Sequence, residues 1–296
     1  MTYKNPPLKV QSPQNPDTDF DKRVAGKAQK LARFRWFRQT YSFLKKWQQI
    51  FIKSPPMVAQ DLESEFFTDV DTDRCLQDLN RQAVAFGFQL PAAAIGEILV
   101  FARKKLCFEP DFNNFPFYLR EVEDGRLPRD NNRQTYCALV QDLKNCKTIA
   151  KLVKDPVLLE IAHRYLQYWP ETITTHLTWS IASDRSLKES QKHYPPCNFH
   201  YDIAGYNFMT MNFYITPVRS VFDGPHMMIE GTHKKKPWSF FLAGRQSDAQ
   251  INHHFPDKVR IILGPAGFGF MEDPSCIHRV LPPSSDHRLI FQIRYS

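Results

Sequence analysis

The sequence lacks the features that mark membrane-spanning and secreted proteins. Its 296 residues contain no run of eighteen apolar residues, and no cleavable signal pattern follows Met1. The six cysteines form no C-x-x-C pair, as is usual for reduced cytosolic thiols. There is no internal repeat, and no recognised nucleic-acid-binding motif accompanies the basic residues. These absences predict a cytoplasmic protein that does not bind nucleic acid.

The composition suits one folded domain of ordinary size preceded by an arm. Apolar residues make up 42% of the chain and aromatic residues 14%, which is enough to bury a core. Residues 1–60 hold twelve Lys and Arg against three Asp, a net charge of +9, whereas the remainder has 27 basic and 28 acidic residues, a net of −1. We therefore expect a basic N-terminal arm over residues 1–60 and a single domain over residues 61–296.

The arm contains a predicted amphipathic helix over residues 24–53, which ends before Pro55. Its apolar residues fall on one face and its basic residues on the other: Phe34, Phe37, Tyr41, Leu44, Trp47 and Phe51 against Arg35, Arg38, Lys45, Lys46 and Lys53. Such a helix leaves three uses open. It could dock on its own domain, burying residues such as Phe37, Leu44 and Trp47, lie at a membrane surface as a peripheral contact, or bind an anionic partner.

Helices are also expected between the arm and the C-terminal strands. Residues 72–86 carry helical periodicity that ends at Gly87, and a second helix begins at Pro91 and ends near Lys105. Residues 109–134 are rich in turn formers and predict a loop. Helical segments are expected again over residues 134–168.

Two histidines, one carboxylate and one arginine form the candidate site. His200 and Asp202 are two residues apart on a predicted strand, so their side chains point to the same side. His278 would complete the two-histidine, one-carboxylate set of non-haem Fe(II) oxygenases, which leaves three metal positions open. Arg288 could grip a carboxylate of a cosubstrate such as 2-oxoglutarate. The plain alternative is that His200 is a core histidine and Asp202 a turn former.

Two segments alternate polar and apolar residues, as a strand with one polar face does. In residues 206–216 the polar set is Thr210, Asn212 and Tyr214, and in residues 288–295 Arg288 shares a face with Ile290, Gln292 and Arg294. Asn212, Tyr214 and Gln292 are therefore candidate cosubstrate-binding residues together with Arg288. The alternative is that these polar side chains hydrogen-bond to one another inside the fold.

The C-terminal part of the chain resembles the phytanoyl-CoA dioxygenase-like family of Fe(II)- and 2-oxoglutarate-dependent oxygenases. Besides the His200-x-Asp202 pair, the matching stretches are residues 213–218, 224–234, 264–270 and 277–295. The resemblance covers about residues 70–296 and is strongest after residue 150. Glu230 departs from the family, because the glycine-rich turn usually carries proline there.

The resemblance implies an α+β fold, with a double-stranded β-helix (jelly-roll, cupin-like) core and flanking N-terminal helices. It implies Fe(II) held by His200, Asp202 and His278, with 2-oxoglutarate and dioxygen as cosubstrates. The family's halogenating relatives replace the carboxylate by a small residue, and Asp202 is present here. Hydroxylation of a C–H bond in a small-molecule substrate, such as an acyl or anionic compound, is therefore implied. Two alternatives stay open: an inactive metal-binding jelly roll that acts as a membrane-associated interaction module, and a non-oxidative metalloenzyme.

Overall fold

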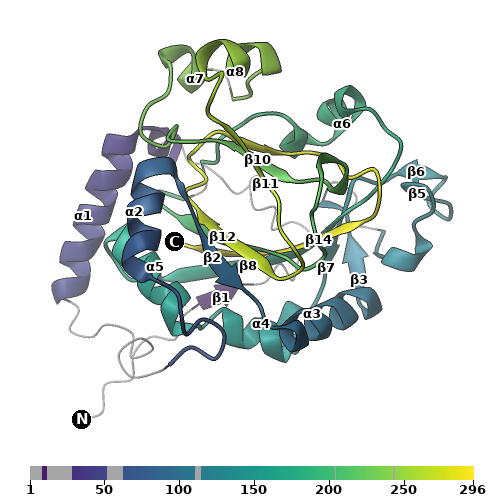
Figure 1. Ribbon diagram of the computed structural model, residues 1–296, viewed down its shortest axis with the longest axis horizontal. Helices are drawn as coiled ribbons and strands as arrows, with labels where there is room; N and C mark the ends of the chain where they lie inside the picture. Colours follow the sequence, from purple (N-terminus) through teal and green to yellow (C-terminus); the bar gives the residue numbers. More distant parts are fainter. Residues whose placement is uncertain (1–8, 12–28, 52–62, 111–114, 204, 243) are drawn as a thin grey trace.

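The chain forms a mixed α/β structure around a large, mainly antiparallel sheet (Figure 1). The computed structural model describes residues 9–11, 29–51, 63–110, 115–203, 205–242 and 244–296. The large sheet has nine strands, in the order β2 (Val84–Gln89), β12 (Phe268–Glu272), β9 (Met209–Tyr214), β14 (Arg288–Tyr295), β8 (Thr172–Ser180), β7 (Cys137–Val140), β3 (Leu106–Phe108) and β4 (Phe117–Tyr118), with β1 (Lys9–Gln11) parallel to β8.

A smaller sheet faces the large one. It consists of β11 (Val259–Ile262), β10 (His226–Ile229) and β13 (His278–Val280), all antiparallel. The side chain of His226 on β10 reaches Glu272 on β12, so the inner faces of the two sheets are in contact. A separate hairpin pairs β5 (Arg126–Leu127) with β6 (Arg133–Gln134).

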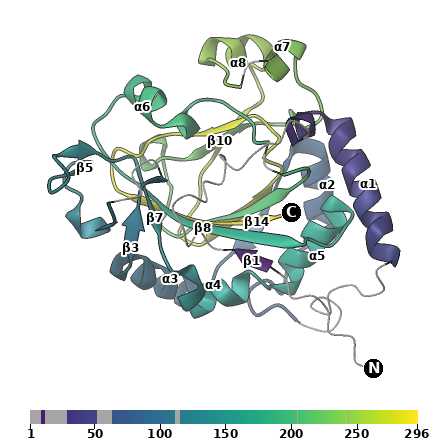
Figure 2. The ribbon, with the colours of Figure 1, turned by 180° about the vertical axis from the view of Figure 1, so that it is seen from behind.

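The helices cover the outer faces of both sheets (Figures 1 and 2). Near the large sheet lie α2 (Thr72–Gln82), α3 (Ala92–Lys104), α4 (Lys147–Leu152) and α5 (Pro156–Leu166), and α1 (Arg35–Phe51) lies at the edge of the molecule beyond α2. The other helices are α6 (Leu187–His193), α7 (Trp238–Leu242) and α8 (Asp248–His254). The 3₁₀ turns are η1 (Gln29–Arg33), η3 (Leu119–Glu121), η4 (Leu143–Asn145), η5 (Pro195–Cys197) and η6 (Val221–Asp223).

The alternation expected for β9 and β14 is confirmed. Met211, Phe213, Phe291 and Ile293 belong to the main core, which includes residues of α2 to α5. Burying one apolar face of each strand against helices leaves the other face, with Asn212 and its polar neighbours, directed between the sheets. The fold thus creates an enclosed polar interior beside the candidate site.

Two predicted helices differ from the structure. The helix predicted over residues 72–86 ends at Gln82, because Ala83 adopts a left-handed conformation and its N–H bonds to the carbonyl of Leu79. The residues that follow form β2 and pair with β12. The segment predicted as helical over residues 134–168 includes β7, since its apolar run pairs with β3 and β8 before α4 and α5 begin.

The helix of the arm is present and docks on the domain, but the expected burial of Leu44 and Trp47 on docking is wrong. Leu44 and Trp47 are exposed, whereas Arg38 and Ser42 are buried. The ends of the predicted helix, residues 24–28 and 52–53, lie outside the described residues. No helix in the described ranges is long and apolar enough to cross a membrane.

Candidate metal centre

The structure brings His200, Asp202 and His278 together between the two sheets. Each offers a ligand atom, and these three atoms lie within 4.8 Å of one another. His200 follows η5, and His278 opens β13. The two backbones exchange hydrogen bonds, from His200 N to His278 O at 2.9 Å and from His278 N to His200 O at 2.8 Å. This one-residue bridge, rather than the longer strand expected at His200, places two distant segments side by side.

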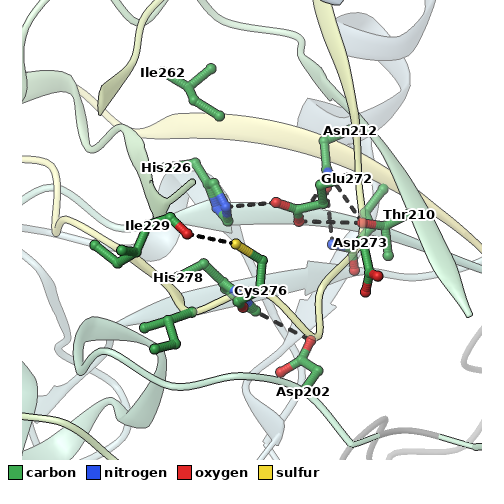
Figure 3. Close-up of polar contacts among 12 residues, drawn as sticks. Asp202, Thr210, Asn212, His226, Ile229, Ile262, Glu272, Asp273, Cys276 and His278 are labelled. Carbon is green, nitrogen blue, oxygen red and sulfur yellow. Dashed lines mark hydrogen bonds and ion pairs between the residues drawn. The ribbon is translucent and has the colours of Figure 1, made fainter. Parts of the chain in front are cut away.

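Asp202 completes the group from the same segment as His200. Its backbone N–H donates to Pro274 O at 2.8 Å, which fixes its position. The carboxylate then lies between the imidazoles, with Oδ1 3.5 Å from Nε2 of His200 and Oδ2 3.8 Å from Nε2 of His278. Figure 3 shows Asp202 pointing at His278.

Both histidines are held with Nε2 directed into the group. Nδ1 of His200 lies 2.8 Å from the carbonyl of Asn198, and Nδ1 of His278 lies 2.8 Å from the carbonyl of Cys276. A carbonyl only accepts hydrogen bonds, so each Nδ1 carries the proton and each Nε2 presents a lone pair. Metal-binding histidines are oriented in this way.

The surroundings keep the two imidazoles neutral. Burial lowers the pKa of His200 to about 4, with His278 adding to the effect, and burial likewise lowers the pKa of His278. Burial raises the pKa of Asp202, against the opposing influence of His200 and Arg294. Two neutral nitrogen acceptors and a carboxylate therefore converge without a donor among them. A divalent cation at their centre would satisfy all three and favour the ionised form of Asp202.

A buried contact between a histidine and a carboxylate beside this group was not predicted from the sequence. Nε2 of His226 lies 2.8 Å from Glu272 Oε2, and the His226 ring stacks on His278 with centroids 5.3 Å apart. Burial alone would raise the pKa of Glu272, yet His226, His278 and Thr210 together lower it to about 2 (Figure 3). The available signal was an acidic residue ending the otherwise apolar strand Phe268–Glu272.

Three of the candidate cosubstrate residues are already hydrogen-bonded within the protein. Asn212 Nδ2 lies 3.3 Å from both Thr210 Oγ1 and Glu272 Oε1, and Gln292 Nε2 donates to Asn212 Oδ1 at 2.9 Å. Tyr214 donates to Ile262 O at 3.0 Å and accepts from His226 N at 2.9 Å. These contacts favour the alternative in which the polar face of β9 and β14 hydrogen-bonds internally.

Arg288 is a buried cation without a carboxylate partner among the described residues. It is 4% exposed, and burial lowers its pKa. Its guanidinium donates to Gly224 O and, at 2.8 Å, to Ser180 Oγ, while Nε has no hydrogen-bond partner in the described part of the chain. A buried charge is costly unless it is paired, so this arginine is suited to binding an anion.

Cys276 lies beside the group but is not a thiolate. Its thiol donates to Ile229 O at 2.9 Å, and burial raises its pKa to about 12 (Figure 3). A protonated, buried thiol of this kind is a core side chain rather than a metal ligand.

Comparison with known proteins gives a likeness in structure only. No protein-family model matches the chain, and no curated protein sequence matches it. Among solved structures, the non-heme alpha ketoglutarate dependent epimerase SnoN from nogalamycin biosynthesis has 15% identity and a TM-score of 0.50, over 76% of this chain and 82% of SnoN. SnoN in complex with Fe3+, alpha ketoglutarate and nogalamycin RO has 16% identity over the same shares, with a TM-score of 0.50.

HygX from Streptomyces hygroscopicus, with nickel, 2-oxoglutarate and hygromycin B bound, has 12% identity over 77% of this chain and 87% of HygX, with a TM-score of 0.49. At such low identities the likeness concerns the fold. The chain therefore shares its fold with SnoN, a non-haem enzyme that depends on alpha ketoglutarate.

Proposed function

We propose that the chain is an Fe(II)- and 2-oxoglutarate-dependent oxygenase with a jelly-roll core, distantly related to the phytanoyl-CoA dioxygenase-like family. The observation that carries this proposal is the convergence of His200, Asp202 and His278 as three acceptors without a donor. Two imidazoles and one carboxylate on one side of an ion are the ligand set that non-haem Fe(II) oxygenases use. In the SnoN complex, iron and alpha ketoglutarate are bound on the same fold.

In this proposal His200, Asp202 and His278 hold the iron, and Arg288 binds a cosubstrate carboxylate. Bound iron, 2-oxoglutarate and dioxygen would supply the oxidising chemistry, with hydroxylation of a small-molecule C–H bond as the outcome. Arg288 contributes a charge without a carboxylate partner in the described part of the chain. Tyr214 connects this arginine to the neighbourhood of the metal ligands, since its ring is 5.9 Å from the guanidinium carbon and its hydroxyl accepts from N of His226, whose ring stacks on that of His278. The bonds that Asn212, Tyr214 and Gln292 make within the protein give these residues supporting roles.

The test uses the full chain without oxygen and does not require the substrate. Adding Fe(II) and then 2-oxoglutarate should produce the visible charge-transfer band of an iron–2-oxoglutarate chelate, and admitting oxygen should release succinate. His278→Ala should abolish the band, whereas His253→Ala, which removes an exposed histidine on α8, should leave it unchanged. Metal binding with neither the band nor succinate would overturn the proposal in favour of an inactive metal-binding module or a non-oxidative metalloenzyme.

A further inference from the structure

Helix α1 docks on the domain through a mixed polar and aromatic side and leaves most of its large apolar residues exposed. The side chains turned toward the domain include buried Arg38 and Ser42 and partly buried Lys45 and Gln49. The opposite side carries large apolar residues that stand in solvent: Trp36, Phe43, Leu44, Trp47, Ile50 and Phe51. Trp36 is 60% exposed and Phe51 is 75% exposed. An amphipathic surface helix ordinarily buries its apolar stripe, so this orientation calls for an explanation.

The polar side of α1 is satisfied by the domain, so the docking is specific. Gln49 exchanges two hydrogen bonds with the backbone of Trp169, at 2.9 and 2.8 Å. Lys45 Nζ lies 2.9 and 2.8 Å from the two carboxylate oxygens of Glu171. Arg38 donates to the carbonyls of Ala32 and His233. With these partners, α1 cannot rotate to bury its apolar side without breaking buried polar contacts.

Aromatic stacking from Phe37 and Tyr41 strengthens the same orientation. Tyr41 stacks on Tyr206 with ring centroids 5.0 Å apart, and Phe37 lies 6.1 Å from the same ring. The exposed apolar row of α1 is extended by Trp238 of α7, which is 74% exposed and packs edge-on against Phe34. The apolar surface therefore spans two elements.

The charges that η1 and α1 themselves carry are of one sign. Residues 29–51 contain no Asp or Glu. Arg35 and Lys46 are exposed on α1, and Lys30 is exposed on η1. A two-fold contact between α1 helices of two copies would bring like charges together, which disfavours a second copy as the occupant. Negative charge on the occupant would complement this surface.

We propose that α1 and Trp238 form a site for the interface of an anionic lipid bilayer. Exposed tryptophan and phenylalanine side chains flanked by Lys and Arg are the composition of helices that lie flat at a membrane surface. The 17 residues of α1 provide a rod of about 26 Å for such a contact. Anionic headgroups attract the basic residues, and the apolar row enters the acyl boundary. This proposal does not rest on the function proposed above.

The test is flotation of the full chain with vesicles of phosphatidylcholine alone or mixed with phosphatidylserine. We expect binding to the mixed vesicles at low salt, weaker binding at high salt because the charges are screened, and little binding to phosphatidylcholine alone. Trp47→Ser and Phe51→Ser should each lower the vesicle partition coefficient about tenfold. Lys46→Glu should also lower the partition coefficient, by a larger factor at low salt than at high salt.

Phe222→Ser is a matched control, since Phe222 is an exposed aromatic residue (62%) on η6. Phe222 lies far from α1. Its neighbour Gly224 contacts Arg288, the first residue of β14, whereas Glu171, which binds Lys45 of α1, is hydrogen-bonded to Ser296, just after the last residue of β14. The eight residues of β14 place the Phe222 region and the α1 docking surface about 27 Å apart along the strand. The control should bind vesicles like the unaltered protein.

Three results would overturn the proposal. The first is no binding of the full chain to the mixed vesicles, and the second is equal binding by the Trp47→Ser variant. The third is a dimer in sedimentation that Trp47→Ser converts to a monomer without any vesicle binding, which would assign the surface to contact between copies. Vesicle binding needs no iron or 2-oxoglutarate, so its failure is separable from failure of the oxygenase proposal.

Discussion

The space between the two sheets and the outer side of α1 depart from the usual distribution of polarity in opposite ways. Between the sheets, His226, Glu272 and Arg288 are almost completely buried. On α1, Trp36 and Phe51 are largely exposed. Buried charge and exposed apolar surface both reduce stability unless something compensates, so each location is informative about function.

The two regions differ in what compensates. Between the sheets, the buried carboxylate of Glu272 has a partner within the protein, His226. The converging acceptors His200, Asp202 and His278 have no donor among them. On α1 the polar side chains are hydrogen-bonded to the domain, whereas the large apolar side chains are exposed and are not covered by the described part of the chain. Variants that act on one region and leave the other unchanged test this separation.

The largest effect is expected from removing the shared carboxylate of the candidate metal centre. Asp202→Ala takes away the one carboxylate among the three candidate ligands and should weaken Co(II) or Fe(II) affinity by more than about 100-fold, since even residues that merely support metal ligands are worth about 10–100-fold. Metal titration followed by absorption of the Co(II) complex measures this. Vesicle flotation of the same variant should be unchanged, and a variant with unaltered metal affinity would remove Asp202 from the site.

A stability effect of about 3–5 kcal/mol is expected at the neighbouring buried carboxylate, Glu272. Glu272→Ala leaves Thr210 and Asn212 without their buried acceptor and removes the carboxylate 2.8 Å from His226, and breaking one side of a buried pair has this cost. The free energy of unfolding from urea titration measures it.

The pH dependence of that loss has a definite sign. The pKa of Glu272 is lowered from 4.5 to about 2, so the carboxylate adds stability at neutral pH that disappears as pH falls between these two values. Glu272→Gln should therefore differ most from the unaltered protein at neutral pH and least near pH ~2. A difference that does not change with pH would show that packing, not charge, sets the effect.

Arg288→Gln should weaken 2-oxoglutarate binding by two or more orders of magnitude, because losing one partner of a buried charge pair costs about 2–5 kcal/mol. Iron affinity should change little, since the metal ligands are untouched. Titration of the iron-loaded protein with 2-oxoglutarate measures both. If the affinity is unchanged, Arg294, on the same face of β14, becomes the candidate for the carboxylate-binding role.

The sequence predicted the parts of the molecule that depend on local spacing. The alternation of β9 and β14, the start of α3 after Pro91 and the proximity of His200 to Asp202 follow from periods of two and from helix-start chemistry. The pairing of Glu272 with His226 could not be predicted, because the partners lie on strands of different sheets. Nothing local in either strand specifies the other.

The side on which α1 docks could not be predicted, for a related reason. Helical periodicity identifies the apolar side of a helix but not the surface on which the helix docks. That surface presents the Trp169 backbone, Glu171 and the Asn207 side chain, which donates to Ser42 at 2.9 Å, so it selects the polar side. The helix end at Ala83 was missed because alanine seldom adopts the left-handed conformation seen there.

Arg38→Met should lower the free energy of unfolding by about 1–3 kcal/mol, because it leaves the carbonyls of Ala32 and His233 without a buried donor. His233 belongs to the turn after β10, so the loss should loosen α1 from the smaller sheet. Hydrogen exchange of α1 amides would measure this loosening. Arg35→Met is the matched control, since Arg35 is exposed on the same helix.

The smallest expected change in the free energy of unfolding concerns Lys45, and comparing it with Trp47 distinguishes the docked side of α1 from its exposed side. Lys45→Met removes an ion pair in which Glu171 is half exposed, with side-chain exposures of 18% and 52%, and pairs of this kind contribute about 0.2–1 kcal/mol. Trp47→Ser, two positions further along the helix, should change the free energy of unfolding by less than about 0.5 kcal/mol, because the side chain is about half exposed and its ring contacts within the described residues are with Phe43 and Phe51 of the same helix. Vesicle binding should show the reverse order, with a large loss for Trp47→Ser and a small one for Lys45→Met. If both measurements ranked the two variants alike, the docked and exposed sides of α1 would not be functionally distinct.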